Sequence, residues 1–93
     1  ITKSLLAAYY QNNDVDSIER TIVPKLNVKD IDPVMLGFYS YVLLTKGKDE
    51  DAQKFFLKAK EKGLTRKRLS LFVNYKEVLD EFIEKLKPLG SLD

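Results

Sequence analysis

The stretch LGFYSYVLLTKGKDEDAQKFFLKAKEKGL, residues 36–64, decides the fold of this chain. Its characteristic residues recur at offsets that place them on the facing sides of two helices joined by a turn. They are Leu36, Tyr39, Ser40, Leu43, Gly47, Ala52, Phe56 and Ala59. A weaker copy lies 34 residues upstream, where Leu5 aligns with Tyr39. A period in this range is typical of stacked helical hairpins, in which each unit buries its apolar face against a neighbour.

Residues that start and stop helices mark the ends of the predicted elements. Asp14 and Asp32 precede apolar stripes and are expected to be N-caps, because an aspartate side chain accepts hydrogen bonds from the first free amides of a helix. Pro24 lacks an amide donor and should stop or kink the second helix early. Gly47 and Gly63 follow later stripes and are suited to the left-handed conformation that ends a helix.

These signals predict an all-α chain in a single domain, residues 1–93, with about five helices. We expect a degenerate hairpin over 2–26, a main hairpin over 33–63 and a terminal helix over 66–87 that is either continuous or broken near Asn74. No run of residues alternates with period two, so no strand is expected. Short connections should make consecutive helices antiparallel.

The composition is that of an ordered, helix-rich domain. Hydrophobic residues make up 44% of the 93 positions and charged residues 32%, with a formal charge of +2. The longest apolar stretch, Val34–Leu44, is far shorter than the roughly 20 residues of a membrane-spanning helix. The chain begins at Ile1 and lacks a signal-like sequence, so we expect a fragment of a larger protein. A cytoplasmic location is expected, although the absence of cysteine is compatible with any compartment.

The main hairpin resembles a tetratricopeptide repeat. Bulky, small and aromatic residues occupy that family's offsets at Leu36, Tyr39, Ser40, Leu43, Ala52 and Phe56. Two positions depart from the family pattern, because Leu36 stands where tryptophan is usual and Leu64 where proline is usual. The resemblance implies a short α-solenoid with a concave groove that binds a protein or peptide. Small side chains at Ser40 and Ala52 would let the paired helices approach closely.

A second resemblance covers about one unit. The segment KGKDEDAQKFFLKAKEKGLT, residues 46–65, is similar to a pentatricopeptide unit, a helical hairpin that reads single-stranded RNA one base per repeat. Two or three irregular units offer little reading length. RNA binding is therefore the second hypothesis.

The tetratricopeptide resemblance implies a groove lined by the first helix of each hairpin. By register, its residues are Lys3, Ala7, Tyr10, Gly37, Tyr41, Leu44 and Thr45. Such a groove is aromatic and apolar, so it is suited to a hydrophobic peptide or an amphipathic helix. The alternative is that Tyr10, Tyr41 and Leu44 contact the next helix of the stack.

The chain has one marked basic cluster, Lys58, Lys60, Lys62, Arg66, Lys67 and Arg68. This patch would take a phosphate backbone, an acidic protein or an anionic membrane surface. The alternative is a solvated face, since lysines are common in the last turn of a helix and no aromatic residue is interleaved here.

Catalysis is not expected. Histidine and cysteine are absent, and no cofactor or metal motif appears. The carboxylate pairs Asp14 with Asp16 and Asp49 with Asp51 lie at helix starts, where capping explains them. The sequence favours a non-catalytic protein interaction or scaffold module. An RNA-binding fragment and a self-assembling structural piece are the alternatives.

Overall fold

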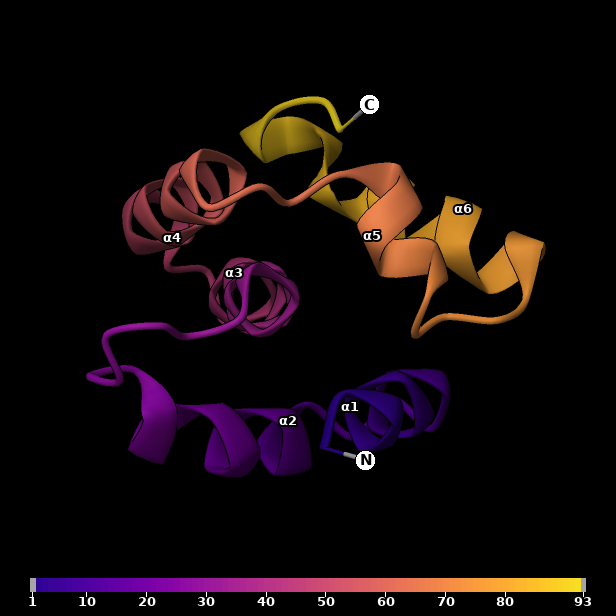
Figure 1. The fold of residues 1–93 in the computed structure, drawn as a ribbon, viewed down its shortest axis with the longest axis horizontal. Coiled ribbons are helices and arrows are strands. Elements are labelled where there is room, and N and C mark those ends of the chain that lie inside the picture. The colour runs from indigo at the N-terminus through magenta and orange to yellow at the C-terminus, as the bar shows by residue number, and fades with distance from the viewer. Residues whose placement is uncertain (1, 93) are drawn as a thin grey trace.

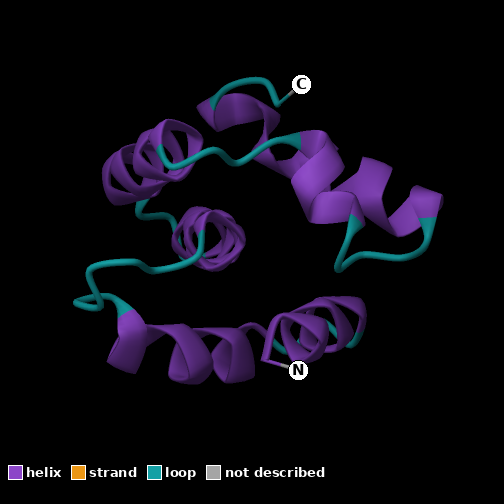
Figure 2. Ribbon diagram, viewed as in Figure 1, coloured by secondary structure: helices purple, strands orange, loops and turns teal. Residues whose placement is uncertain are grey.

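The computed structural model describes residues 2–92, and the side chains of residues 5–92. Within this part the chain is all-α, with no strand (Figure 2), as predicted. Its elements are α1 (Thr2–Gln11), α2 (Val15–Ile22), η1 (Val23–Lys25), α3 (Pro33–Thr45), α4 (Asp49–Glu61), α5 (Arg66–Ser70), α6 (Lys76–Leu86) and η2 (Lys87–Leu89). None of the described helices combines the length and the hydropathy needed to cross a bilayer.

The predicted caps form as expected. The Asp14 carboxylate accepts a hydrogen bond from the backbone amide of Ser17 at 3.2 Å and starts α2. The Asp32 carboxylate accepts one from the amide of Val34 at 2.8 Å and starts α3. Helix α2 ends one residue before Val23, where the chain tightens into the 3₁₀ turn η1 that contains Pro24. The first hairpin is therefore short because proline cannot continue the hydrogen-bond ladder.

Helix α3 is the centre of the fold. Figure 1 looks along α3, with α1 and α2 on one side of it and α4, α5 and α6 on the other. All residues of α3 from 33 to 43 except Tyr39 are buried. Helices α3 and α4 pack against each other, and the small side chains of Ser40 and Ala52 are fully buried, as is Phe56. Small residues at these positions permit the close approach of the two helices.

The last predicted helix is in fact two helices. Helix α5 ends at Ser70 and α6 begins at Lys76, so the break falls around Asn74, and residues 2–92 contain six α-helices where about five were expected. Both Leu69 and Val73 are buried. Residues 71–75 then connect α5 to α6, which contacts both α5 and α3.

The described part measures 29 × 26 × 25 Å along its principal axes. Its final helix α6 folds back onto α3, and η2 contacts α4. A stack of hairpins with an open concave side would leave one face of α3 uncovered. The arrangement does not confirm such a solenoid, which stays a prediction.

Candidate interaction surface

The residues predicted to line a groove do not form one open surface. Ala7, Tyr10 and Tyr41 are buried, with only 3% of Tyr10 and 7% of Tyr41 exposed. Leu44 is half-buried and Thr45 is exposed. These last two line a shallow cavity of about 240 Å³ together with Tyr41 and Lys85.

Lys3 and Gly37 were also predicted to line the groove. The side chain of Lys3 lies outside the described residues. Gly37 faces Leu64 in the connection between α4 and α5, because a Cβ atom added to Gly37 would lie 3.0 Å from Leu64 Cδ2. Gly37 is therefore buried on the side of α3 that Leu64 covers, and its place in a groove stays a prediction.

Helix α6 fills the space between α1 and α3. The ring of Phe82 lies 5.0 Å from the ring of Tyr10, 5.6 Å from Tyr41 and 4.6 Å from Phe38, measured between centroids. Tyr10 and Tyr41 also meet edge to face at 5.1 Å. These two tyrosines therefore pack against α6, the last α-helix of the described chain, while the assignment of the groove stays a prediction.

A polar contact anchors α6 beside this aromatic cluster. The Tyr10 hydroxyl donates a hydrogen bond to Glu81 Oε1 at 2.7 Å, and Lys85 Nζ lies 3.3 Å from the same oxygen. Burial raises the pKa of Tyr10 far above its ordinary value, and the Glu81 carboxylate raises it further. The hydrogen bond from Tyr10 lowers the pKa of Glu81, with a second contribution from Lys85. Neither group changes protonation near neutrality, so the pair positions α6 and is not an acid–base couple.

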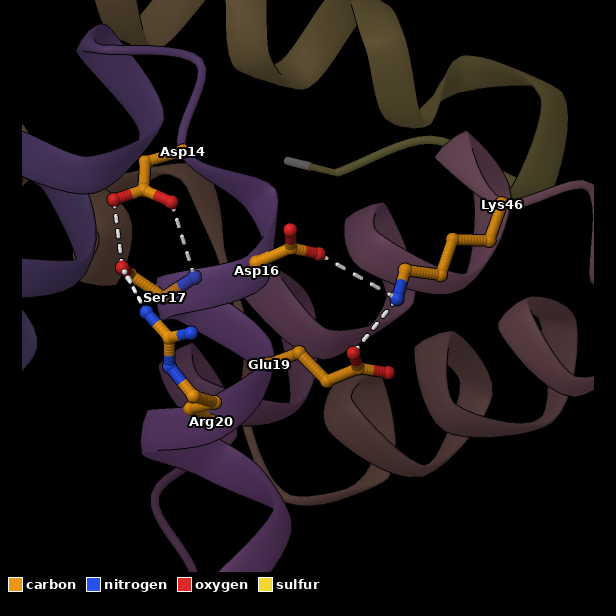
Figure 3. Close-up of polar contacts among 6 residues, drawn as sticks. All are labelled: Asp14, Asp16, Ser17, Glu19, Arg20 and Lys46. Atoms are coloured by element: carbon orange, nitrogen blue, oxygen red, sulfur yellow. Dashed lines mark hydrogen bonds and ion pairs between the residues drawn. The ribbon is translucent and has the colours of Figure 1, made fainter.

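A second polar contact joins the two hairpins at the surface (Figure 3). Lys46, just after α3, places Nζ 2.7 Å from Glu19 Oε1 and 3.8 Å from Asp16 Oδ1 on α2. The hydrogen bond to Glu19 raises the pKa of Lys46. This partly exposed ion pair holds a helix end and has no catalytic geometry.

The paired carboxylates at the start of α2 have structural roles. Both Asp14 oxygens bind Ser17, the second through a hydroxyl hydrogen bond of 2.6 Å, and these bonds lower the pKa of Asp14. Ser17 Oγ accepts a further bond from Arg20 Nη2 at 3.0 Å (Figure 3). Within the described residues no three acidic side chains lie close enough to hold a metal ion.

Three of the six basic residues predicted to form one patch have separate partners in the structure. Arg66 forms an ion pair with Asp80 on α6. Lys60 Nζ lies 5.8 Å from the centroid of the Phe56 ring. Lys62 Nζ donates to the carbonyl oxygen of Lys29 at 3.4 Å. Arg66, Lys60 and Lys62 therefore each have a contact of their own, and one continuous patch of all six residues stays a prediction.

Of the six patch residues, three have side chains with no ion pair, hydrogen bond or cation–π contact among the residues that the structure describes: Lys58, Lys67 and Arg68. All three are exposed. Lys67 and Arg68 lie on α5, whose first turn follows the Thr65 cap. They are the part of the predicted patch that has both positive charge and an adjoining hollow.

That hollow is a cavity of about 430 Å³. We call the residues around it the α5 surface; they are Asp32, Gly63, Thr65, Lys67, Arg68, Leu71 and Phe72. Leu71 is 68% exposed, the largest exposed fraction among the bulky hydrophobic side chains described. Sequence reasoning missed Leu71, although one signal was available: it lies outside the apolar stripe that contains Leu69 and Val73.

Comparison of the chain with protein-family models, with curated proteins and with solved structures finds no match in any of the three. The tetratricopeptide and pentatricopeptide resemblances therefore depend on the sequence pattern alone. A function has to be argued from the surface itself.

Proposed function

We propose that this chain is a non-catalytic protein-interaction module, and that its partner contacts the α5 surface. The observation that carries the proposal is the cavity of about 430 Å³ bordered by exposed Leu71 and by two cations that lack an ion pair within the described chain, Lys67 and Arg68. Protein interfaces commonly combine a buried apolar centre with a charged or polar rim. The α5 surface has both parts on one short helix and its flanking connections.

Leu71 is the natural centre of such an interface. Burying apolar surface contributes roughly 25 cal/mol for each Å² removed from water, and an apolar side chain beside a cavity can be covered on several sides at once. In the free chain most of Leu71 faces water. A partner that covers it would therefore gain hydrophobic free energy that the fold itself does not use.

The groove predicted from the sequence is less suited to a partner in this arrangement. Phe82 already packs against Tyr10 and Tyr41 in that space. A peptide could enter only by displacing α6, which would expose Phe82 and break the hydrogen bond between Tyr10 and Glu81. The partner surface is for this reason placed at α5.

A peptide-display selection tests the proposal. Peptides enriched on the wild-type chain should bind the variant Leu71→Ser at least about tenfold more weakly, the loss of roughly 1.4 kcal/mol expected for one central contact. Leu57→Ser is the matched control, because Leu57 is half exposed on α4 and lies outside the α5 surface. Sedimentation would identify self-association. No enrichment, or enriched peptides that are indifferent to Leu71→Ser, would contradict the proposal.

A further inference from the structure

This inference rests on the proposed function and identifies the chemistry of the partner. We propose that the α5 surface binds an acidic peptide segment that inserts one bulky apolar side chain into the cavity beside Leu71. Carboxylates on either side of the inserted residue pair with Lys67 and Arg68.

The size and lining of the cavity suit one side chain. A volume of about 430 Å³ is near the lower end of ligand pockets, which hold roughly 300 to 1,000 Å³. Leu71 and Phe72 supply apolar surface, and Gly63 contributes no side chain to fill the hollow. Gly63 has a φ of +102°, which favours glycine, and a Cβ atom added there would lie 3.9 Å from Arg68 Nη1, so the guanidinium lies beside this glycine.

The charge of the lining favours a carboxylate-bearing segment. Its ionisable side chains are the cations of Lys67 and Arg68 and the carboxylate of Asp32, which gives a net charge of +1. Asp32 accepts the amide hydrogen of Val34, so part of its charge is directed to the start of α3. Neither cation has an ion pair within the described chain, whereas their neighbour Arg66 is paired with Asp80. Charge complementarity at this rim would speed association and select acidic partners.

A peptide agrees with this lining better than RNA or a membrane. RNA carries a phosphate at every nucleotide and would bring one close to Asp32, while a peptide can space its carboxylates around a neutral residue. Single-stranded RNA sites also present exposed aromatic rings for stacking, whereas the aromatic residue of this lining, Phe72, is half-buried and its most exposed apolar side chain, Leu71, is aliphatic. A bilayer is too flat to fill a hollow.

The probe for this proposal is a short synthetic peptide in which one tryptophan is flanked by glutamates. The chain contains no tryptophan, so tryptophan emission reports the peptide alone. We expect saturable binding of this peptide to the full chain, with emission shifted to shorter wavelength as the indole leaves water. Two control peptides should bind at least about tenfold more weakly. One has alanine in place of tryptophan and is detected by an attached dye. The other has lysines in place of the glutamates.

Charge reversal locates the site. The double variant Lys67→Glu with Arg68→Glu should weaken binding by at least about tenfold. Lys54→Glu with Lys58→Glu is the matched control, because it makes the same change in net charge on exposed positions of α4 outside the cavity. Circular dichroism checks that both double variants fold. Equal binding to wild type and to both variants would overturn the proposal.

Two further outcomes separate this inference from the proposed function. Tighter binding of a single-stranded oligouridylate, or of phosphatidylserine vesicles, at Lys67 and Arg68 would overturn the acidic peptide as occupant. Peptides that depend on Leu71 in the display selection but carry no acidic residues would overturn the inference while leaving the protein-interaction module supported.

Discussion

At the scale of single residues, Tyr10 has two separate functions in one side chain. Its ring packs edge to face against Tyr41 and Phe82, and its hydroxyl reaches Glu81 at 2.7 Å. The ring contacts are independent of pH, whereas the hydrogen bond is strongest when the carboxylate is ionised. Through Tyr10, the packing of α6 against α1 therefore depends on the protonation state of Glu81.

The variant Tyr10→Phe isolates the hydroxyl. It keeps the ring and removes the main cause of the lowered pKa of Glu81, so that pKa should rise toward its ordinary value, with Lys85 retaining part of the shift. The pKa of Glu81 is lowered in the folded protein, so the ionised Glu81 carboxylate stabilises the fold at pH values above its ordinary pKa. This stabilisation is lost as the pH falls through the pKa of Glu81 in the folded protein. An NMR titration of the Glu81 carboxyl group measures the shift. Tyr9→Phe removes a hydroxyl that has no hydrogen-bond partner among the described residues, so it should leave the Glu81 titration unchanged.

Residue-level predictions succeeded where the cause is local. The caps at Asp14 and Asp32 depend on atoms within three residues, and the sequence displays them directly. The contact between Gly37 and Leu64 could not be predicted in this way, because Leu64 comes from a distant part of the chain. Leu71 was missed because the exposure of an apolar side chain depends on whether other parts of the folded chain cover it, and this is not visible in the local sequence.

At the scale of elements, Gly90 shows how the end of the chain docks onto α4. It has φ of +149° and follows η2, whose Leu89 carbonyl accepts a hydrogen bond from Gln53 Nε2 at 2.7 Å. A Cβ atom added to Gly90 would lie 2.9 Å from Cε2 of the buried ring of Phe56. The backbone of Gly90 is therefore part of the packing against α4.

Comparing Gly90→Ala with Gly47→Ala separates steric contact from backbone strain. Both positions have positive φ, but a Cβ atom at Gly47 would meet no atom within 4 Å. We expect Gly47→Ala to lower the free energy of unfolding by about 1 kcal/mol and Gly90→Ala by about 2 to 4 kcal/mol. Denaturant titrations measure both losses, and hydrogen exchange at residues 87–92 would show whether the segment detaches. Equal losses in the free energy of unfolding would mean that the Phe56 ring can move away from the added Cβ atom without destabilising the fold.

Helix positions were largely predictable because apolar period, caps and breakers act within one element. The split of the last helix near Asn74 was foreseen only as an alternative, since the stripes on its two halves look continuous in sequence. The partners of the basic residues were not predictable at this scale. The spacing of Arg66 from its neighbours in the sequence does not reveal that it forms an ion pair with Asp80 on α6.

At the scale of the whole molecule, the final helix determines which surfaces are open. Periodicity shows that α1 and α3 each have an apolar face, but it does not show which later helix covers them. Phe82 joins Tyr10 of α1 to Phe38 and Tyr41 of α3, so one side chain links the first, third and sixth helices. A solenoid leaves that space to a partner. Here the chain occupies it with its own residues, and the open hollow lies at α5 instead.

The variant Phe82→Ala tests whether α6 is integral to one cooperative core. Removing a fully buried phenylalanine typically costs about 3 to 5 kcal/mol, a large part of the roughly 5 to 15 kcal/mol that stabilises a domain. For a chain of this size we expect the melting temperature to fall by at least about 15 °C in a single transition. Ile83→Ala, at the next and only partly buried position, should cause a clearly smaller fall. Circular dichroism follows both variants. If α1 to α4 instead melted at the wild-type temperature after α6 had separated, the groove between α1 and α3 would be accessible in the folded protein, and the predicted groove would again compete with the α5 surface as the partner site.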